Sequence, residues 1–258
     1  MTVRPFVIAV DGPSAAGKGT LARRLAVHYG FAFLDTGLLY RAVGRRLLDA
    51  GQDPADAAAA AAAAALVTSA DLENGSLRGE AVAQAASKVA AIPEVRRVLL
   101  ILQREFAVRP PALPDGRATA GIVLDGRDIG TVVCPAADVK IFVTASPEER
   151  ARRRYKELLD RGEDVIYARV LQDMMDRDNR DSGRAASPLV PAADAHVIDS
   201  TALDADAAFA AAVALVDEHR RRKVAGGRCP PRNCRPEPPP GSSAREAKWA
   251  ITPSSSCS

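Results

Sequence analysis

The stretch that decides the fold reads Gly12-Pro13-Ser14-Ala15-Ala16-Gly17-Lys18-Gly19-Thr20, and it lies between an apolar run and a segment of helical period. Backbone N–H groups of such a loop turn toward phosphate oxygens, and its glycines permit the tight turn and the close approach. The helix that begins near Lys18 adds unpaired N–H groups and the positive end of its dipole. Because Lys18 can reach the β- and γ-phosphates, the stretch predicts a binding loop for a nucleoside triphosphate.

The end of this loop departs from the general form, in which Ser or Thr directly follows the lysine and binds magnesium. Here Gly19 intervenes and Thr20 follows. We expect Mg²⁺ to bind together with the nucleotide. Thr20 is the candidate protein ligand, and water and phosphate oxygens hold most of the ion.

Five short apolar runs predict buried parallel strands. Four of them end in an acid or a small turn residue, and segments of helical period lie between them. This alternation predicts an α/β fold, a five-stranded parallel sheet flanked by helices, whose polar strand ends converge on one cleft. The predicted strands are residues 6–10, 31–34, 122–124, 139–143 and 196–198. The predicted helical segments are residues 20–29, 39–50, 82–107, 146–161, 167–177 and 204–222.

Local signals mark two helix starts and one loop. Ser146 followed by Pro147 and by Glu149 three residues on is a capping box with proline at the first helical position. Asp53-Pro54 is expected to open, in the same way, the helix through the alanine tract at residues 57–65. Residues 109–121 are rich in proline and glycine and predict a surface loop.

The formal charge of +3 is unevenly distributed along the 258 residues. Residues 220–258 carry nine basic and two acidic side chains, so the remaining 219 residues have a net charge of −4. The main domain therefore lacks the basic character of a nucleic-acid-binding protein. From residue 224 onward the chain is rich in proline and serine and poor in large apolar residues. This predicts one folded domain at residues 1–223 and a disordered basic tail at residues 224–258.

Cysteine usage indicates a reducing compartment. Of the four cysteines only Cys134 precedes the tail, and the sequence contains no CxxC pair, so neither a zinc site nor a disulfide framework is expected. The first apolar run is too short for a secretory signal, and the alanine tract supplies about half of the roughly 20 apolar residues of a membrane span. We expect a cytoplasmic monomer with neither a membrane nor a nucleic acid as partner.

Four further segments indicate where the phosphoryl group goes. In chain order, the segments read Asp35-Thr36-Gly37 with Tyr40-Arg41; Ala85-Ala86-Ser87-Lys88-Val89-Ala90 leading to Pro93-Glu94-Val95-Arg96; Asp125-Gly126-Arg127-Asp128-Ile129-Gly130-Thr131; and Arg177-Asp178-Asn179-Arg180-Asp181. Together with the GKGT loop, in this order and at this spacing, they resemble the cytidylate kinases, a family of P-loop nucleoside monophosphate kinases. The resemblance covers about residues 4–220.

The resemblance implies phosphorylation of CMP and dCMP by Mg-ATP. It implies a short lid and a reduced acceptor-binding insert, since residues 71–80 are short where many relatives carry a β-rich insert. Residue by residue, it assigns the acceptor phosphate to Thr36, Arg41 and Arg127; the cytosine edge to Ser87, Arg96 and Asp128; and the ribose and transferred phosphate to Arg177 and Asp181.

Catalysis of phosphoryl transfer is positioning plus positive charge, and arginines on different elements suit that task. We therefore expect Lys18, Arg127 and Arg177 to be catalytic. Asp125 is a fourth candidate, which either binds Mg²⁺ through water or orients Arg127.

The segment at residues 146–161 is expected to form part of the lid, with Arg153 and Arg154 on ATP. A solvated basic helix face stays open as the alternative, above all for Arg150 and Arg152. An ordinary i,i+4 ion pair is the alternative for Arg177 with Asp181, and a small-residue helix contact is the alternative for Ser87.

Three other functions stay open from the sequence alone. An adenylate or uridylate kinase would share the GKGT loop, although Ser87, Arg96 and the DGRD segment argue against both. A nucleotide-binding regulator that no longer catalyses would keep Lys18 and lose acceptor residues. The basic tail could bind nucleic acid.

Overall fold

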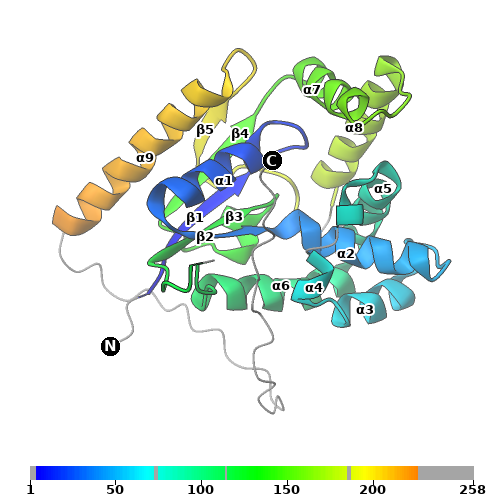
Figure 1. Cartoon of the computed structure of the whole chain (residues 1–258), viewed down its shortest axis with the longest axis horizontal. Helices are drawn as coiled ribbons and strands as arrows, with labels where there is room; N and C mark the ends of the chain where they lie inside the picture. Colours follow the sequence, from blue (N-terminus) through cyan, green and yellow to red (C-terminus); the bar gives the residue numbers. More distant parts are fainter. Residues whose placement is uncertain (1–3, 73–74, 114, 185–186, 226–258) are drawn as a thin grey trace, which may run out of the picture.

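A parallel five-stranded sheet forms the centre of the computed structural model, which describes residues 4–72, 75–113, 115–184 and 187–225 (Figure 1). The strand order is β2-β3-β1-β4-β5, and all four pairings are parallel. Each predicted strand is confirmed within one residue at either end. The bounds are β1 Phe6–Asp11, β2 Ala32–Asp35, β3 Gly121–Asp125, β4 Val139–Thr144 and β5 His196–Asp199. The predicted tail lies outside the described residues, apart from its first two.

The register of the sheet gathers carboxylates at one edge. Asp125 at the end of β3 is the partner of Asp35 in β2 and of Val10 in β1, and Asp11 follows Val10 directly. Because β1 lies in the middle of the sheet, the loop that leaves it starts at the centre of this edge. The prediction that polar strand ends converge is therefore confirmed for β1, β2 and β3, whereas Asp199 at the end of β5 lines a separate cavity.

Helices cover both faces of the sheet (Figure 1). The side chains of α1 and α9 pack on one face, against a core that includes Ile8 and Ile141. Phe106 of α6 and Ile129 pack on the opposite face, against Ile122 and its neighbours. The bounds are α1 Lys18–Tyr29, α2 Thr36–Asp49, α3 Ala57–Ala65, α4 Ser69–Leu72, α5 Glu80–Val89, α6 Pro93–Val108, α7 Pro147–Asp160, α8 Tyr167–Ser182 and α9 Ala205–Ala225, with a 3₁₀ turn η1 Gly75–Arg78 and a π-helical turn η2 Ile129–Val133.

Two helix predictions need correction. The segment predicted at residues 82–107 is two helices, α5 and α6, because Ile92 is held extended before Pro93 and cannot continue the helix. The alanine helix begins at Ala57 and not at Asp53-Pro54, because the Asp56 side chain caps its first N–H groups. The N-cap at Ser146 is confirmed, since its hydroxyl accepts the Glu149 N–H at 3.2 Å. The predicted capping box is not closed, because the Ser146 N–H donates to Thr201 and the Glu149 carboxylate pairs with the arginines of α7.

Two groups of helices stand beside the sheet with cores of their own. The acceptor-side group comprises α2, α3, α5 and α6 and packs around Leu39, Leu47 and Leu99. Its helices approach closely, since a Cβ on Gly44 would lie 2.9 Å from the Cβ of Ala85. The lid helices α7 and α8 share a separate, smaller cluster of buried residues, Ala151, Leu158, Val170 and Met174.

The segment predicted to be a reduced insert, residues 71–80, contains the end of α4, η1 and the start of α5 in its described part. Over the described ranges, the chain has no helix with the length and apolar character of a membrane span.

Candidate active site

The phosphate loop leaves β1 through a position that only glycine can occupy. Gly12 has φ +144°, and a Cβ built there would lie 2.0 Å from the backbone oxygen of Val143. The loop closes at Gly17, whose left-handed conformation caps the N-terminus of α1 at Lys18. The predicted order of strand, loop and helix is therefore present.

Asp11 fastens this loop to the segment that follows β3. Its carboxylate accepts the N–H groups of Ile129 and Gly130 at 2.8 and 2.7 Å. Burial raises the pKa of Asp11 to about 6, although the two hydrogen bonds oppose the shift. We did not predict this role from the sequence; the available signal was an acid at the end of a buried strand.

Lys18 and Asp125 face each other at the carboxyl edge of the sheet, with Nζ and Oδ1 3.8 Å apart. Burial, followed by the charge of Arg127, lowers the pKa of Lys18 to about 8, and the Asp125 charge opposes this shift. Burial raises the pKa of Asp125 to about 6, against the charge of Lys18.

The residues present at this point suit a magnesium ion that is bound mostly by phosphate and water. Asp125 Oδ1 is buried and has no hydrogen-bond partner among the described residues. Its other oxygen lies against Gly19, 3.1 Å from where a Cβ would stand. Thr20 is exposed in the first turn of α1. The described part of the chain holds no group of three His, Cys, Asp or Glu side chains that could bind a metal by itself.

The three side chains predicted for the acceptor phosphate already have protein partners. The Thr36 hydroxyl donates to the backbone oxygen of Asp125 at 2.8 Å. One nitrogen of Arg41 donates to the backbone oxygen of Leu77 at 2.9 Å, and Arg127 donates to Gly126 at 3.2 Å. Arg41 and Arg127 therefore keep further N–H donors for a phosphate.

Two of the three residues predicted to read the base form a buried ion pair. The Arg96 guanidinium donates to the Asp128 carboxylate, and their side chains are 11% and 8% exposed. The Arg96 guanidinium also lies 5.8 Å from the ring centroid of Tyr40. The third residue, Ser87, is buried on α5, and its hydroxyl accepts from Arg180 at 3.2 Å.

The end of α8 brings a second cluster of charges to the site. Asp181 accepts from Arg127 Nε at 3.2 Å and from Arg184, which follows the helix. The simple i,i+4 pair of Arg177 with Asp181 therefore does not describe this carboxylate. Burial, followed by the charge of Arg127, lowers the pKa of Arg177 to about 10. The Arg177 Nε is buried and finds no hydrogen-bond partner in the described residues.

The lid arginines differ in their surroundings. Arg150 is buried, pairs with Asp178 at 2.7 Å, and lies 3.4 Å from the backbone oxygen of Ser14 in the phosphate loop. Arg152 is 74% exposed and pairs only with Glu149 among the described residues. The alternative of a solvated face thus describes Arg152 but not Arg150.

Arg153 and Arg154 lie on the side of α7 that faces the site. Arg153 donates to the hydroxyl and backbone oxygen of Ser200, at 3.0 and 2.6 Å, and its Nη1 would lie 3.9 Å from a Cβ on Gly17. Arg154 pairs with Glu80 at the start of α5. The predicted lid helix therefore contacts both the donor side and the acceptor side.

Sequence reasoning missed Arg180 and Arg184 as members of the site. Arg180 follows Arg177 at helical spacing on α8, so periodicity could have identified it. Arg184 lies just beyond the end of α8, three residues after Asp181. Sequence reasoning also missed Glu80 and Asp178, whose partners come from distant parts of the chain.

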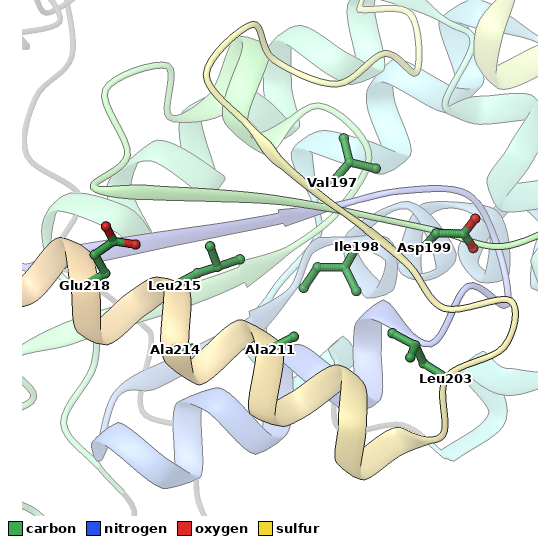
Figure 2. A pocket seen from close by; sticks show the side chains of 8 residues that line it. All are labelled: Val197, Ile198, Asp199, Leu203, Ala211, Ala214, Leu215 and Glu218. Atoms are coloured by element: carbon green, nitrogen blue, oxygen red, sulfur yellow. The ribbon is translucent and has the colours of Figure 1, made fainter.

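A cavity of about 420 Å³ lies elsewhere, between β5 and α9 at the edge of the sheet (Figure 2). Its lining is mainly aliphatic, with the carboxylates of Asp199 and Glu218, and it includes none of the site arginines. It lacks the positive charge that a nucleotide phosphate requires, and we do not assign the nucleotide to it.

A phosphate loop at the centre of a parallel sheet, facing arginines from two lid helices, is the construction of a P-loop kinase. Residues 8–218 match the family model described as cytidylate kinase, and the chain belongs to that family. Cytidylate kinase of Paramagnetospirillum magneticum is 59% identical over 214 residues, which cover 83% of this chain and 99% of that protein. The enzyme of Methylocella silvestris is 58% identical over 212 residues, 82% of this chain and 94% of that protein. A solved shikimate kinase from Bacteroides thetaiotaomicron aligns with a TM-score of 0.42 at 13% identity over 83% of this chain and 98% of that one, a likeness too distant to support an argument.

Proposed function

We propose that this protein transfers the terminal phosphoryl group of ATP to CMP or dCMP, giving ADP with CDP or dCDP. Membership in the cytidylate kinase family supports the choice of acceptor. The observation that carries the reaction type is a pair of arginines at and beyond the end of α8 whose buried nitrogens have too few protein partners. Arg177 Nε and Arg184 Nε are both buried donors without an acceptor in the described residues. Phosphate oxygens of bound nucleotides would supply the missing acceptors.

The roles of the charged residues follow from where negative charge accumulates on the phosphoryl group during transfer. An oxygen of the acceptor phosphate attacks the γ-phosphorus in line with the departing ADP, and negative charge spreads over the transferred group. That oxygen is already ionised, so the step needs no general base. Lys18, Arg127 and Arg177 would stabilise the transferred group. Arg153 and Arg154 would hold ATP beneath the lid, which excludes water that could accept the phosphoryl group.

Mg²⁺ accompanies ATP in this proposal and neutralises charge on the β- and γ-phosphates when bound. Asp125 would hold it, directly or through water, and Thr20 is the second candidate. The buried oxygen of Asp125 that lacks a hydrogen-bond partner supports this assignment. Lys18, 3.8 Å from the same oxygen, would then turn to the phosphates.

The acceptor base is selected by the pair of Arg96 and Asp128. An ionised carboxylate can only accept, and a guanidinium can only donate. Cytosine offers an amino donor at its fourth position, where uracil offers a carbonyl, so Asp128 would bond the first and repel the second. Ser87 would add a hydroxyl to the same edge.

A coupled ADP-release assay tests this function, with CMP, dCMP, UMP and AMP offered in parallel at saturating Mg-ATP. We expect turnover with CMP and dCMP and at least roughly tenfold lower kcat/KM with UMP and AMP. Preference for UMP or AMP would reassign the acceptor. ADP release that does not depend on any acceptor would contradict kinase function.

We further propose that residues 1–223 form the catalytic domain of a cytoplasmic monomer, and that the tail is dispensable. The end of the family match at residue 218 supports this division. A chain that ends at Ala225 should keep its activity and elute at the volume of a monomer in gel filtration. Lost activity or a changed oligomeric state would contradict the division.

A further inference from the structure

A chain of side-chain hydrogen bonds joins α5 to both lid helices. Arg154 of α7 donates to Glu80 Oε2 at the start of α5, and Glu80 Oε1 accepts from Gln84 Nε2 at 3.0 Å. One turn further along α5, Gln84 Oε1 accepts from Arg180 Nη2 of α8 at 3.3 Å. Arg180 Nε then donates to the Ser87 hydroxyl at 3.2 Å. These hydrogen bonds connect Arg154, which is predicted to hold ATP, with Ser87, which is predicted to contact the base.

Each member of this chain has a defined polarity. Burial raises the pKa of Glu80, but the hydrogen bond and charge of Arg154 outweigh it and hold the pKa below its usual value, so Glu80 is an acceptor only. Arg180 can only donate. Gln84 must therefore turn its amino group to Glu80 and its oxygen to Arg180. Ser87 in turn accepts from Arg180, which leaves its proton and its second lone pair for other partners.

Side-chain hydrogen bonds connect α5 with the lid helices, which lie beside it (Figure 1). The buried apolar residues of α5, such as Val82 and Val89, belong to the cluster of the acceptor-side helices. Those of α7 and α8, such as Leu158 and Met174, form the separate lid cluster. The position of Ser87 relative to the lid thus depends on directional hydrogen bonds, which tolerate less displacement than apolar packing.

We propose that Arg180 is a positioning residue for the acceptor nucleotide, which orients the Ser87 hydroxyl in the base pocket and, through Gln84 and Glu80, couples the base to Arg154. The inference rests on the proposed function. When the Ser87 hydroxyl accepts a hydrogen bond from Arg180, its rotation is restricted. Without Arg180 the hydroxyl can rotate to donate to or accept from either cytosine or uracil. Loss of Arg180 therefore weakens discrimination between the two bases.

The first test measures kcat/KM for CMP and UMP in the wild type, Arg180→Gln, Ser87→Ala and the double variant. Arg180→Gln should lower the CMP/UMP ratio by roughly 3–10-fold, mainly through KM for CMP with kcat within about twofold. The double variant should fall no further than Ser87→Ala alone, since Arg180 acts through Ser87. Arg180 is exposed, so Arg180→Gln is expected to fold, which thermal unfolding checks. Arg169→Gln, at another exposed arginine of α8, is the matched control and should leave the ratio unchanged.

Equal losses for CMP and UMP, multiplied effects in the double variant, or an unchanged ratio in Arg180→Gln would each overturn the inference while the proposed function stands. A wild-type protein that does not phosphorylate CMP would refute the proposed function itself, and the inference with it.

The second test addresses the link through Gln84. In the wild type, bound CMP should tighten the binding of a non-hydrolysable ATP analogue, and Gln84→Leu should reduce that tightening by about threefold or more. Titration calorimetry with and without CMP measures the two affinities. Equal coupling in wild type and Gln84→Leu, or no coupling in either, would overturn the link to Arg154.

Discussion

Replacing Asp128 by asparagine should remove most of the preference for CMP over UMP. The carboxylate is 8% exposed and paired with Arg96, so water cannot take its place when the charge is lost. Asparagine keeps the shape, but its amide can donate as well as accept and no longer repels the uracil carbonyl. A hydrogen bond to a charged group contributes about 1.5–3 kcal/mol, which corresponds to roughly 10–150-fold in the ratio of kcat/KM values.

The same change should lower stability, because Arg96 loses its full counter-charge in a buried position. A loss of about 1–2 kcal/mol would lower Tm by roughly 2–8 °C in a chain of this size. The assay is coupled ADP release with CMP and UMP at saturating Mg-ATP, together with thermal unfolding. The loss should come mainly from falling kcat/KM on CMP.

Asp138→Asn is the matched control for Asp128→Asn. Its carboxylate is 10% exposed and ion-paired with Arg4 and Lys223, at the amino end of β4 and away from the phosphate loop. It should lower Tm and leave the CMP/UMP ratio intact. If Asp128→Asn also leaves the ratio intact, this carboxylate does not read the base, and discrimination must lie with Ser87 and Arg96.

Lys18→Met should fold normally by circular dichroism and lose roughly 10²–10³-fold in turnover, because its charge tracks the transferred phosphate; near-normal turnover would contradict the reading of the loop. The kcat/KM for ATP should rise with pH through about 6, as Asp125 ionises, and fall above about 8, as Lys18 loses its proton. A profile that is flat across both values would show that neither group titrates in the free enzyme. Gly12→Ala should cost more than about 4 kcal/mol in chemical denaturation, because its Cβ would meet Val143 O at 2.0 Å. Gly162→Ala, with φ +77° and open space around it, should cost only about 1–2 kcal/mol, and similar losses at the two glycines would refute the steric argument.

The parts of the fold that could be predicted are those whose local sequence pattern alone identifies the element and its burial. Strands buried on both faces of a parallel sheet appear as continuous apolar runs, so β1, β3 and β4 could be located closely. β5 could also be located, but the prediction that it is buried was wrong, because it lies at the edge of the sheet and its Val197 is 58% exposed. The start of the alanine helix could not, because a uniform run has no periodicity and the choice between Asp53 and Asp56 as cap depends on the turn between them. The break before α6 did have a signal, in the restriction that Pro93 places on Ile92.

The candidate site divides in the same way. The phosphate loop is one continuous stretch, so its residues and their local roles could be predicted together. The pairing of Asp181 with Arg127 could not, because the two residues are 54 positions apart and meet only in the folded chain. The link from Arg154 to Glu80 likewise depends on how the lid helices lie relative to α5.

The separate apolar cluster that α7 and α8 share affects how this helix pair unfolds. Four buried apolar side chains provide only a small part of the stability of the whole domain, so this helix pair can unfold locally while the sheet stays folded. Native-state hydrogen exchange should therefore register the lid helices as a foldon of their own. Their amide protons would be replaced by deuterium in the earliest phase, and those of β1 and β3 only during global unfolding.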